Sequence, residues 1–350
     1  MHIVRLTGAD ADSIRGLTQY ADRFFERVDN DDCSDDVKDT GVFRIDNHVY
    51  AGYDDDVNGE GKMQFLDTRI LPNMQDIDPL MIPMEVGELV GSASLGAAHK
   101  GMDTLLDIGT QITSAVLDMD KKSADKLIDD GTHVQQGCSA SAQQPILEPV
   151  GGDVSNSYHR LIRYLQPQPS STAAAFKPHV DSTFLTLIPM PELPGLEVWC
   201  PSSSASDESS DPRGEWVRPM VPFDVSLEQD PASDCAYVIA MAGEFLQLTS
   251  NGDVPTCIHR VIPPQHATQN ATYKPRVSAP MFLRPRRGEG ARLDVGRDLT
   301  LVDQPTLSES EPQQSATVDE ETALYFEEGL LEECDLMHLW SAHDDIMKRK

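Results

Sequence analysis

Two of the ten histidines lie in short apolar segments typical of β-strands, next to other polar groups: His179 in FKPHVDSTFLTL and His259 in TCIHRVIPP. Residues i and i+2 of a strand project to the same face, so we expect His179 and Asp181 to point the same way. Together with His259 from a distant strand, they can occupy one face of an octahedral metal ion. Three open positions on the metal favour non-haem Fe(II), whereas Zn²⁺ prefers a closed tetrahedral shell or one open position.

A second polar pair follows seventeen residues after His259, in the segment Lys-Pro-Arg276-Val-Ser278. Arg276 and Ser278 are again two residues apart, so a strand would place both on one face. A guanidinium group beside a hydroxyl group is suited to binding a carboxylate. A dicarboxylic keto acid could chelate the metal at one end and bind Arg276 and Ser278 with its far carboxylate.

The surrounding sequence predicts the elements that must position these residues. Apolar residues at helical spacing predict amphipathic helices over 12–28 and 102–120, and 41–50 and 62–70 have the pattern of short strands. From about residue 157 the chain consists of brief apolar runs separated by Pro, Gly and Ser, which predicts an antiparallel sandwich or barrel. These runs are YHRLIRYL, AFKPHVDSTFLTLIPM, GLEVWC, EWVRPMV, CAYVIAMA, FLQLTS, TCIHRVIPP and RVSAPMFLRP.

Four segments appear in an order typical of one known family: HVDSTFLTLIP, PGLEVW, GEFLQLTSNGDVPTCIHRVIPP and RVSAPMFLRP. In these segments the chain resembles the iron- and 2-oxoglutarate-dependent dioxygenase superfamily, in particular its isopenicillin N synthase-like branch. The resemblance implies a mainly β fold with flanking helices, the double-stranded β-helix or jelly roll. The chain departs from the family pattern in an acidic insertion at 202–214 and a lengthened loop at 265–273.

The resemblance also implies a cofactor and a co-substrate. Fe(II) would be bound by His179, Asp181 and His259, and 2-oxoglutarate by Arg276 and Ser278. Tyr164 in LIRYLQP matches the place where the family has a tyrosine near the co-substrate. O2 would be the oxidant, with ascorbate as the reductant in assays.

Three regions are expected along the chain. Residues 1–150 would form a mixed α/β region packed on the barrel, 151–290 the jelly-roll catalytic core, and 291–350 a linker with a C-terminal helix over 319–347.

The reaction implied is oxidation of an unactivated C–H bond of a small metabolite, by hydroxylation or oxidative cyclisation, in specialised metabolism. A carboxylate at Asp181 disfavours halogenation, because halogenating relatives have a small residue there. One alternative is ring closure of a prenylated amino acid, as in the algal kainoid synthases. A peptide or protein hydroxylase and a non-catalytic jelly-roll binding protein are alternatives of another class.

The composition restricts the partners. The chain has 350 residues, 58 acidic and 28 basic, and a formal net charge of −30. This charge repels nucleic acid and anionic membranes, so we expect a small-molecule partner. The sequence has no signal peptide or long apolar segment, and its six cysteines form no CxxC pair. We therefore expect a cytoplasmic monomer with free thiols.

The sequence predicts less specific roles for several other residues. Phe184, Leu185 and Leu187 are predicted core residues, with Leu185 near the metal, and Met241, Phe245 and Leu248 are also predicted core. The candidate cations for binding an anionic substrate are Lys62, Arg69 and Arg163. Ordinary surface or helix positions are expected for His133, His159, His266, His338 and His343.

Overall fold

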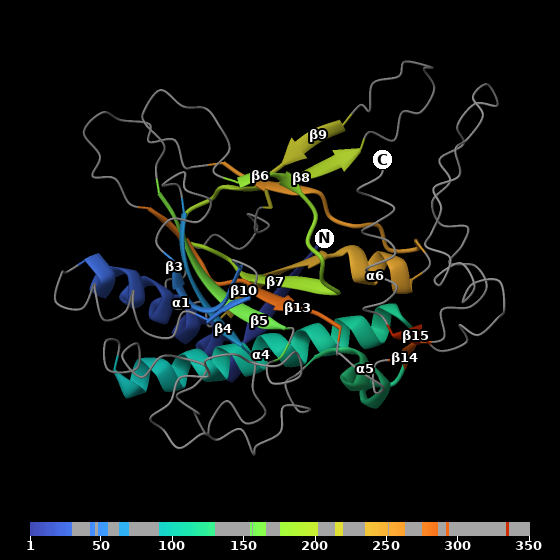
Figure 1. The fold of residues 1–350 in the computed structure, drawn as a ribbon, viewed down its shortest axis with the longest axis horizontal. Helices are drawn as coiled ribbons and strands as arrows, with labels where there is room; N and C mark the ends of the chain where they lie inside the picture. Colours follow the sequence, from blue (N-terminus) through green and yellow to red (C-terminus); the bar gives the residue numbers. More distant parts are fainter. Residues whose placement is uncertain are drawn as a thin grey trace.

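The computed structural model describes about half of the chain (Figure 1). The described residues are 1–29, 43–45, 48–54, 63–69, 91–129, 155, 157–165, 176–201, 214–219, 235–250, 252–262, 275–285, 292–293 and 334–335.

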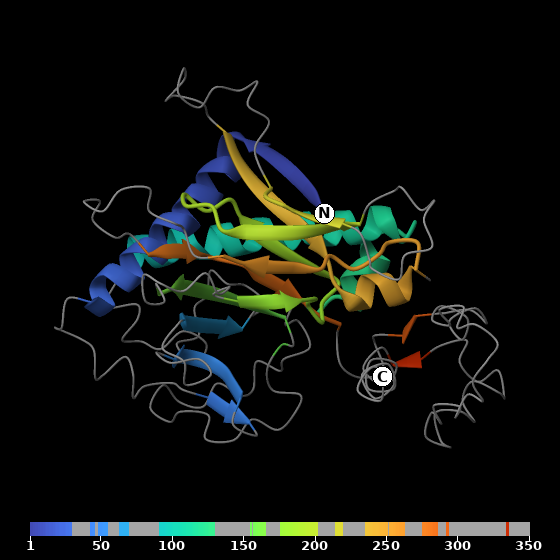
Figure 2. The same cartoon turned by 90° about the horizontal axis from the view of Figure 1, so that it is seen from above.

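A large antiparallel sheet forms the centre of the described structure, in the order β1-β10-β7-β13-β5-β4-β3-β2, with β12 also paired to β5. Figure 2 shows its strands side by side, with β1 (dark blue) near one edge and β2 and β3 (lighter blue) at the other. The strands are β1 (His2–Thr7), β2 (Phe43–Ile45), β3 (His48–Asp54), β4 (Met63–Arg69), β5 (Tyr158–Tyr164), β7 (Leu185–Pro189), β10 (Cys235–Ala242), β12 (Arg276–Ser278) and β13 (Met281–Leu283).

A smaller antiparallel sheet has the order β6-β11-β8-β9. Its strands are β6 (Phe176–His179), β8 (Leu196–Pro201), β9 (Gly214–Val217) and β11 (His259–Val261). β14 (Arg292–Leu293) and β15 (Cys334–Asp335) form a separate pair.

Two long helices, α1 (Gly8–Asp29) and α4 (Ser92–Val116), cover one side of the large sheet, and the small sheet lies on its other side (Figure 1). The short helices are α5 (Lys121–Leu127) and α6 (Glu244–Thr249). Within the described residues no helix is long and apolar enough to cross a membrane.

Strand β5 separates two cores, because its side chains alternate between the two faces of the sheet. Leu161 faces the helices and packs in a large apolar core with Leu17, Phe24 and Leu105. Ile162 faces the small sheet and packs in a second, smaller core that also contains residues from β8 and β11. The candidate site lies on this second side.

The mainly β prediction with flanking helices is confirmed, and so is the helix expected over 12–28. The second helix begins at Ser92 and ends at Val116, two residues before Asp118, whose φ of 50° is not helical. Strands of residues 1–150 join the same large sheet as strands of 151–290.

One predicted strand was wrong. FLQLTS lies in α6, because the N–H groups of Glu244 and Phe245 donate to the carbonyl oxygens of Asp181 and Thr183 at 2.9 and 3.1 Å. These contacts satisfy the first N–H groups of a helix, which have no partner inside it.

Of the helix expected over 319–347, the structure describes only Cys334–Asp335, which form β15. The lengthened loop at 265–273 lies outside the described residues, as does all of the 202–214 insertion except Gly214.

Candidate metal and carboxylate site

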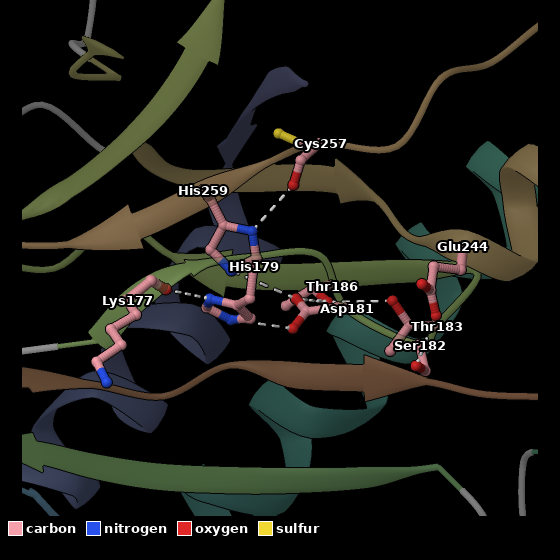
Figure 3. A network of polar contacts seen from close by, with 9 residues as sticks. All are labelled: Lys177, His179, Asp181, Ser182, Thr183, Thr186, Glu244, Cys257 and His259. Atoms are coloured by element: carbon pink, nitrogen blue, oxygen red, sulfur yellow. Dashed lines mark hydrogen bonds and ion pairs between the residues drawn. The ribbon is translucent and has the colours of Figure 1, made fainter. Parts of the chain in front are cut away.

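His179, Asp181 and His259 come together between the two sheets (Figure 3). One ligand atom from each lies within 4.8 Å of the others. The Nε2 atoms of His179 and His259 are 3.6 and 3.7 Å from the two carboxylate oxygens of Asp181. These separations leave room for one ion to bind all three side chains. His179 ends β6 and His259 begins β11, and the two residues are directly paired across these strands.

Backbone carbonyl groups orient both imidazole rings. Nδ1 of His179 lies 2.8 Å from the carbonyl oxygen of Lys177, and Nδ1 of His259 lies 3.0 Å from that of Cys257 (Figure 3). A carbonyl oxygen only accepts hydrogen bonds, so each Nδ1 carries the proton and donates it. Nε2 is therefore the nitrogen of each ring that is left to bind a metal, and it faces Asp181.

The pKa shifts of His259 and Asp181 agree with a cation-binding role. Burial lowers the pKa of His259, although the nearby Asp181 carboxylate opposes this shift. Burial alone would raise the pKa of Asp181, but the two neighbouring imidazole rings and the hydrogen bond from Thr186 bring it below its ordinary value. The site thus favours the ionised carboxylate and the neutral His259 ring, both of which can bind a cation.

Asp181 lies in the bend between β6 and β7, so the alternation of a single strand does not place it beside His179. The prediction that His179 and Asp181 lie side by side is correct, but alternation along one strand is not the reason. The hydroxyl group of Thr186 on β7 donates to Oδ2 of Asp181 at 2.6 Å and fixes the carboxylate. Thr186 was not singled out from the sequence.

Helix α6 holds the bend that carries Asp181. In addition to its backbone contacts, Glu244 accepts a hydrogen bond of 2.8 Å from Ser182 (Figure 3). Gly243 precedes the helix, and a Cβ atom there would lie 2.3 Å from the carbonyl oxygen of Thr183 and 2.6 Å from that of Asp181. Only glycine allows this close approach. The segment Ala-Gly-Glu therefore has a positioning role that sequence reasoning missed.

Arg276 and Ser278 lie on β12 and line the same cavity, as their spacing predicted. Arg276 is only 1% exposed, and its Nε and Nη1 atoms have no hydrogen-bond partner. Tyr164 is paired with Arg276 across β5 and β12, and the guanidinium carbon lies 4.9 Å from the centre of its ring. Burial lowers the pKa of Arg276, and the contact with Tyr164 partly opposes this shift.

The cavity that joins the two groups has a volume of about 290 Å³. Its walls include His179, Asp181 and His259 as well as Arg276 and Tyr164. This volume is near the lower end of the range for small-molecule sites, ~300–1,000 Å³. Apolar residues of the second core, including Phe65, Ile162, Ile188, Leu196, Met241 and Val261, form other parts of the wall.

Other sequence predictions had mixed outcomes. Phe184, Leu185 and Leu187 are core residues, but Leu185 faces the helices, and it is Thr186 that faces the metal cluster. Arg163 also faces the helices, where it forms an ion pair with Asp29, so it is not a substrate cation.

Among the predicted core residues, Met241 and Phe245 are buried. His159 is fully buried on β5 and is not the surface residue expected. Its side chain points toward the helices, because along β5 it alternates with the residues that line the cavity.

The free-thiol prediction holds where it can be compared, at Cys200, Cys235 and Cys257. The side chains of Arg69 and Leu248, and the whole of Lys62, His133, His266, His338 and His343, lie outside the described residues.

Comparisons with known proteins gave matches among solved structures only; no protein-family model and no curated protein matches the chain. One similar structure is the dioxygenase for auxin oxidation 1 from Arabidopsis thaliana, in a binary complex with 2-oxoglutarate. It is 14% identical, with a TM-score of 0.49, over 81% of this chain and 84% of that one.

Two further structures are similar to the chain. Full-length T7H from Neurospora crassa, in complex with alpha-KG, is 16% identical, with a TM-score of 0.47, over 81% of this chain and 74% of that one. The rice dioxygenase for auxin oxidation is 20% identical, with a TM-score of 0.42, over 81% and 73%. At these levels of similarity we base the function on the geometry of the site.

Proposed function

We propose that the chain is an Fe(II)- and 2-oxoglutarate-dependent dioxygenase that oxidises a C–H bond of a small metabolite. One observation carries this proposal. A single cavity contains a cluster of two histidines and one carboxylate, and also a fully buried arginine with two nitrogen atoms that lack a partner.

The cluster fits a ferrous ion. Two imidazoles and one carboxylate supply three donors, and the cavity beside them leaves the other positions of an octahedral ion accessible. A catalytic zinc site also uses three protein ligands, but it typically keeps one open position for water. The bidentate keto acid that Arg276 would help to bind needs two positions and O2 a third.

Arg276 fits the far carboxylate of 2-oxoglutarate. A buried cation is costly unless an anion pairs with it, and no carboxylate of the described residues is bonded to Arg276. Ser278, two residues along the same strand, lines the cavity on the same side. The two side chains would hold the carboxylate, while Tyr164 packs against the guanidinium group and keeps it in place.

The protein would also orient the metal ligands and the substrate and exclude water from the site. When bound, the iron with 2-oxoglutarate and O2 supplies the oxidising power, with succinate and CO2 as co-products. Thr186 and helix α6 fix Asp181, the two carbonyl groups fix the imidazole rings, and the apolar wall shields the substrate carbon from solvent.

The finer assignments belong to the same proposal. The fold would be a jelly roll in which the large and the small sheet face each other across the cavity. The small volume favours a metabolite over a peptide, with hydroxylation or oxidative cyclisation as the outcome. We place the enzyme in specialised metabolism, as a cytoplasmic monomer.

The test is spectroscopic and needs no primary substrate. Protein with one equivalent of Fe(II) is titrated with 2-oxoglutarate without oxygen, and we expect a weak visible charge-transfer band that saturates at one equivalent. Succinate, which lacks the keto group, is the matched control ligand and should give no band. Stoichiometric iron binding without a response to 2-oxoglutarate would overturn the co-substrate assignment, and failure to bind iron would overturn the metal site.

A further inference from the structure

One strand segment contributes two arginines to the wall of the cavity. Arg276, Ser278, Pro280, Phe282 and Arg284 are alternate residues of the segment 276–284, and all five line the cavity. This spacing of two places successive side chains on one face of an extended chain. Arg276, at one end of this segment, is buried, and Arg284, at its other end, is half-buried.

Arg284 has an unsatisfied nitrogen. Its Nε atom is buried without a hydrogen-bond partner, and its guanidinium carbon lies 5.2 Å from the centre of the Tyr158 ring. Arg160, which lines the same cavity, is different, because it donates two hydrogen bonds to Asp67, at 2.7 and 2.8 Å. Asp67 neutralises Arg160, whereas Nε of Arg284 still lacks an acceptor.

The position of Arg284 relative to the metal cluster follows from the strand register. Phe282 on β13 is paired with Thr186 on β7, and Thr186 donates a hydrogen bond to Asp181. Arg284 is two residues past Phe282, or about 7 Å along an extended chain. It therefore lies within reach of a small molecule whose other end is beside the metal cluster.

Two aromatic rings line the cavity next to Arg284. The rings of Tyr158 and Phe282 are stacked, with centroids 4.6 Å apart and planes at 15°. Both residues line the cavity. A flat ring packs well against such a surface.

We propose that Arg284 binds the carboxylate of the primary substrate, and that the substrate is a small aromatic monocarboxylic acid whose ring packs against Phe282 and Tyr158. The guanidinium fork matches a carboxylate in geometry, and Nε supplies one of the two parallel hydrogen bonds. The inference rests on the proposed function, because it takes the metal cluster as the place of reaction.

The test uses four probes: phenylacetate, 3-phenylpropanoate and the methyl ester of each. Their binding to the full chain, loaded with Fe(II) and 2-oxoglutarate without oxygen, is measured by calorimetry. In air, succinate formation is measured with each probe. At least one acid should bind about ten-fold or more tightly than its ester and should increase succinate formation, since one charge-assisted pair is worth about that factor.

Arg284→Gln should weaken binding of the acid by about ten- to a hundred-fold and leave its ester unchanged, so that the preference for the acid disappears. Arg284→Lys should keep part of the preference, because an ammonium group retains the charge but not the planar fork. Arg27→Gln, at an exposed position of α1, is the control and should bind both probes like the parent.

The charge-transfer band separates the two proposals. If the band forms in the parent but neither acid binds better than its ester, or if Arg284→Gln keeps the preference, the substrate assignment is wrong and the proposed function stands. If the band does not form in the parent, the proposed function itself fails. Should Arg284→Gln not fold, as judged by circular dichroism, the acid and ester pairs on the parent and on Arg284→Lys decide the result.

Discussion

The buried cations Arg163 and Arg276 lie on opposite sides of the large sheet and differ in their partners. On the face toward the helices, the buried cation Arg163 forms two hydrogen bonds with Asp29, at 2.6 and 2.8 Å. His159 on that face is neutral at ordinary pH, because burial lowers its pKa to about 3. On the face toward the cavity, the neighbouring cation Arg276 has two unpartnered nitrogen atoms.

This difference indicates which face binds a ligand. A fold tolerates an unpaired buried charge poorly, so its presence on one face marks a place where an anion from outside completes the structure. The buried cation on the side toward the helices, Arg163, already has a carboxylate partner within the protein. Substitutions there should therefore change stability, and substitutions in the cavity should change binding and turnover.

The largest effect is expected from the metal cluster. His179→Ala, Asp181→Ala or His259→Ala should each abolish turnover, because two ligands hold iron far less tightly than three. The free energy of unfolding of the iron-free protein should change little, since the apolar cores do not include these residues. Iron content, succinate formation and urea unfolding are the measurements, with the exposed His2→Ala as the control. Substantial activity in two of the three variants would show that the cluster is not the metal site.

The opposite result is expected on the face toward the helices. Leu161 is 1% exposed and packs in the large core, so Leu161→Ala should lower the free energy of unfolding by about 2–5 kcal/mol. Its half-saturating concentration of 2-oxoglutarate, measured below the unfolding transition, should equal that of the parent. A changed half-saturation with unchanged stability would contradict the separation of the two faces.

Substitution of Arg276 should weaken 2-oxoglutarate binding without lowering stability, and its effect should be smaller than that of losing a metal ligand. Arg276→Gln removes a charge-assisted pair worth roughly 1.5–3 kcal/mol, and should raise the half-saturating concentration of 2-oxoglutarate by about ten- to a hundred-fold. Iron binding should stay near normal, and Arg276→Lys should recover part of the loss. The ligand-free protein should be no less stable, because an uncompensated buried charge has been removed. Superimposable 2-oxoglutarate titrations of the three proteins would show that the carboxylate binds elsewhere.

The sequence predicted those parts of the site that depend on local spacing. Arg276 and Ser278 share a face because β12 is a strand. The long helix at 12–28 followed from its apolar period in the same way. Tyr164 was expected near the co-substrate only from the family resemblance, and its pairing with Arg276 joins distant segments.

The parts that were missed depend on contacts between distant segments. Helix α6 begins where it does because carbonyl groups of the 181–183 bend accept its first N–H groups, and no short apolar run reveals that. The contact of Thr186 with Asp181, and the missing partner of Arg284, likewise exist only after folding.

Thr186 offers a sharper test within the cavity, since its hydroxyl group contacts Asp181 and has no proposed contact with the iron or with 2-oxoglutarate. Thr186→Val keeps the shape of the side chain but removes the hydrogen bond to Asp181. Loss of such a supporting contact typically lowers metal affinity or activity by about ten- to a hundred-fold, and we expect the lower end, because the backbone contacts of α6 still hold the bend. Thr186→Ser restores the hydroxyl group and should recover most of the iron affinity. Equal iron affinity in the Val and Ser variants would show that the hydroxyl group does not position Asp181.

The smallest effect is expected at Asp29, the partner of Arg163 on the face toward the helices. The Asp29 side chain is 60% exposed, whereas that of Arg163 is 5% exposed, so solvent screens the pair and its net contribution is at most about 1 kcal/mol. Arg163 also keeps the hydrogen bond of 2.8 Å that its Nε donates to Gln64 when Asp29 is changed. Asp29→Asn should therefore lower the free energy of unfolding by less than about 1 kcal/mol, and high salt should reduce the difference further. Urea unfolding of parent and variant at low and high NaCl measures this, and the 2-oxoglutarate titration should not change. A large, salt-independent loss of stability would mean that the helix-side cation depends on its carboxylate as strongly as Arg276 depends on its ligand, and the contrast between the two faces of β5 would then disappear.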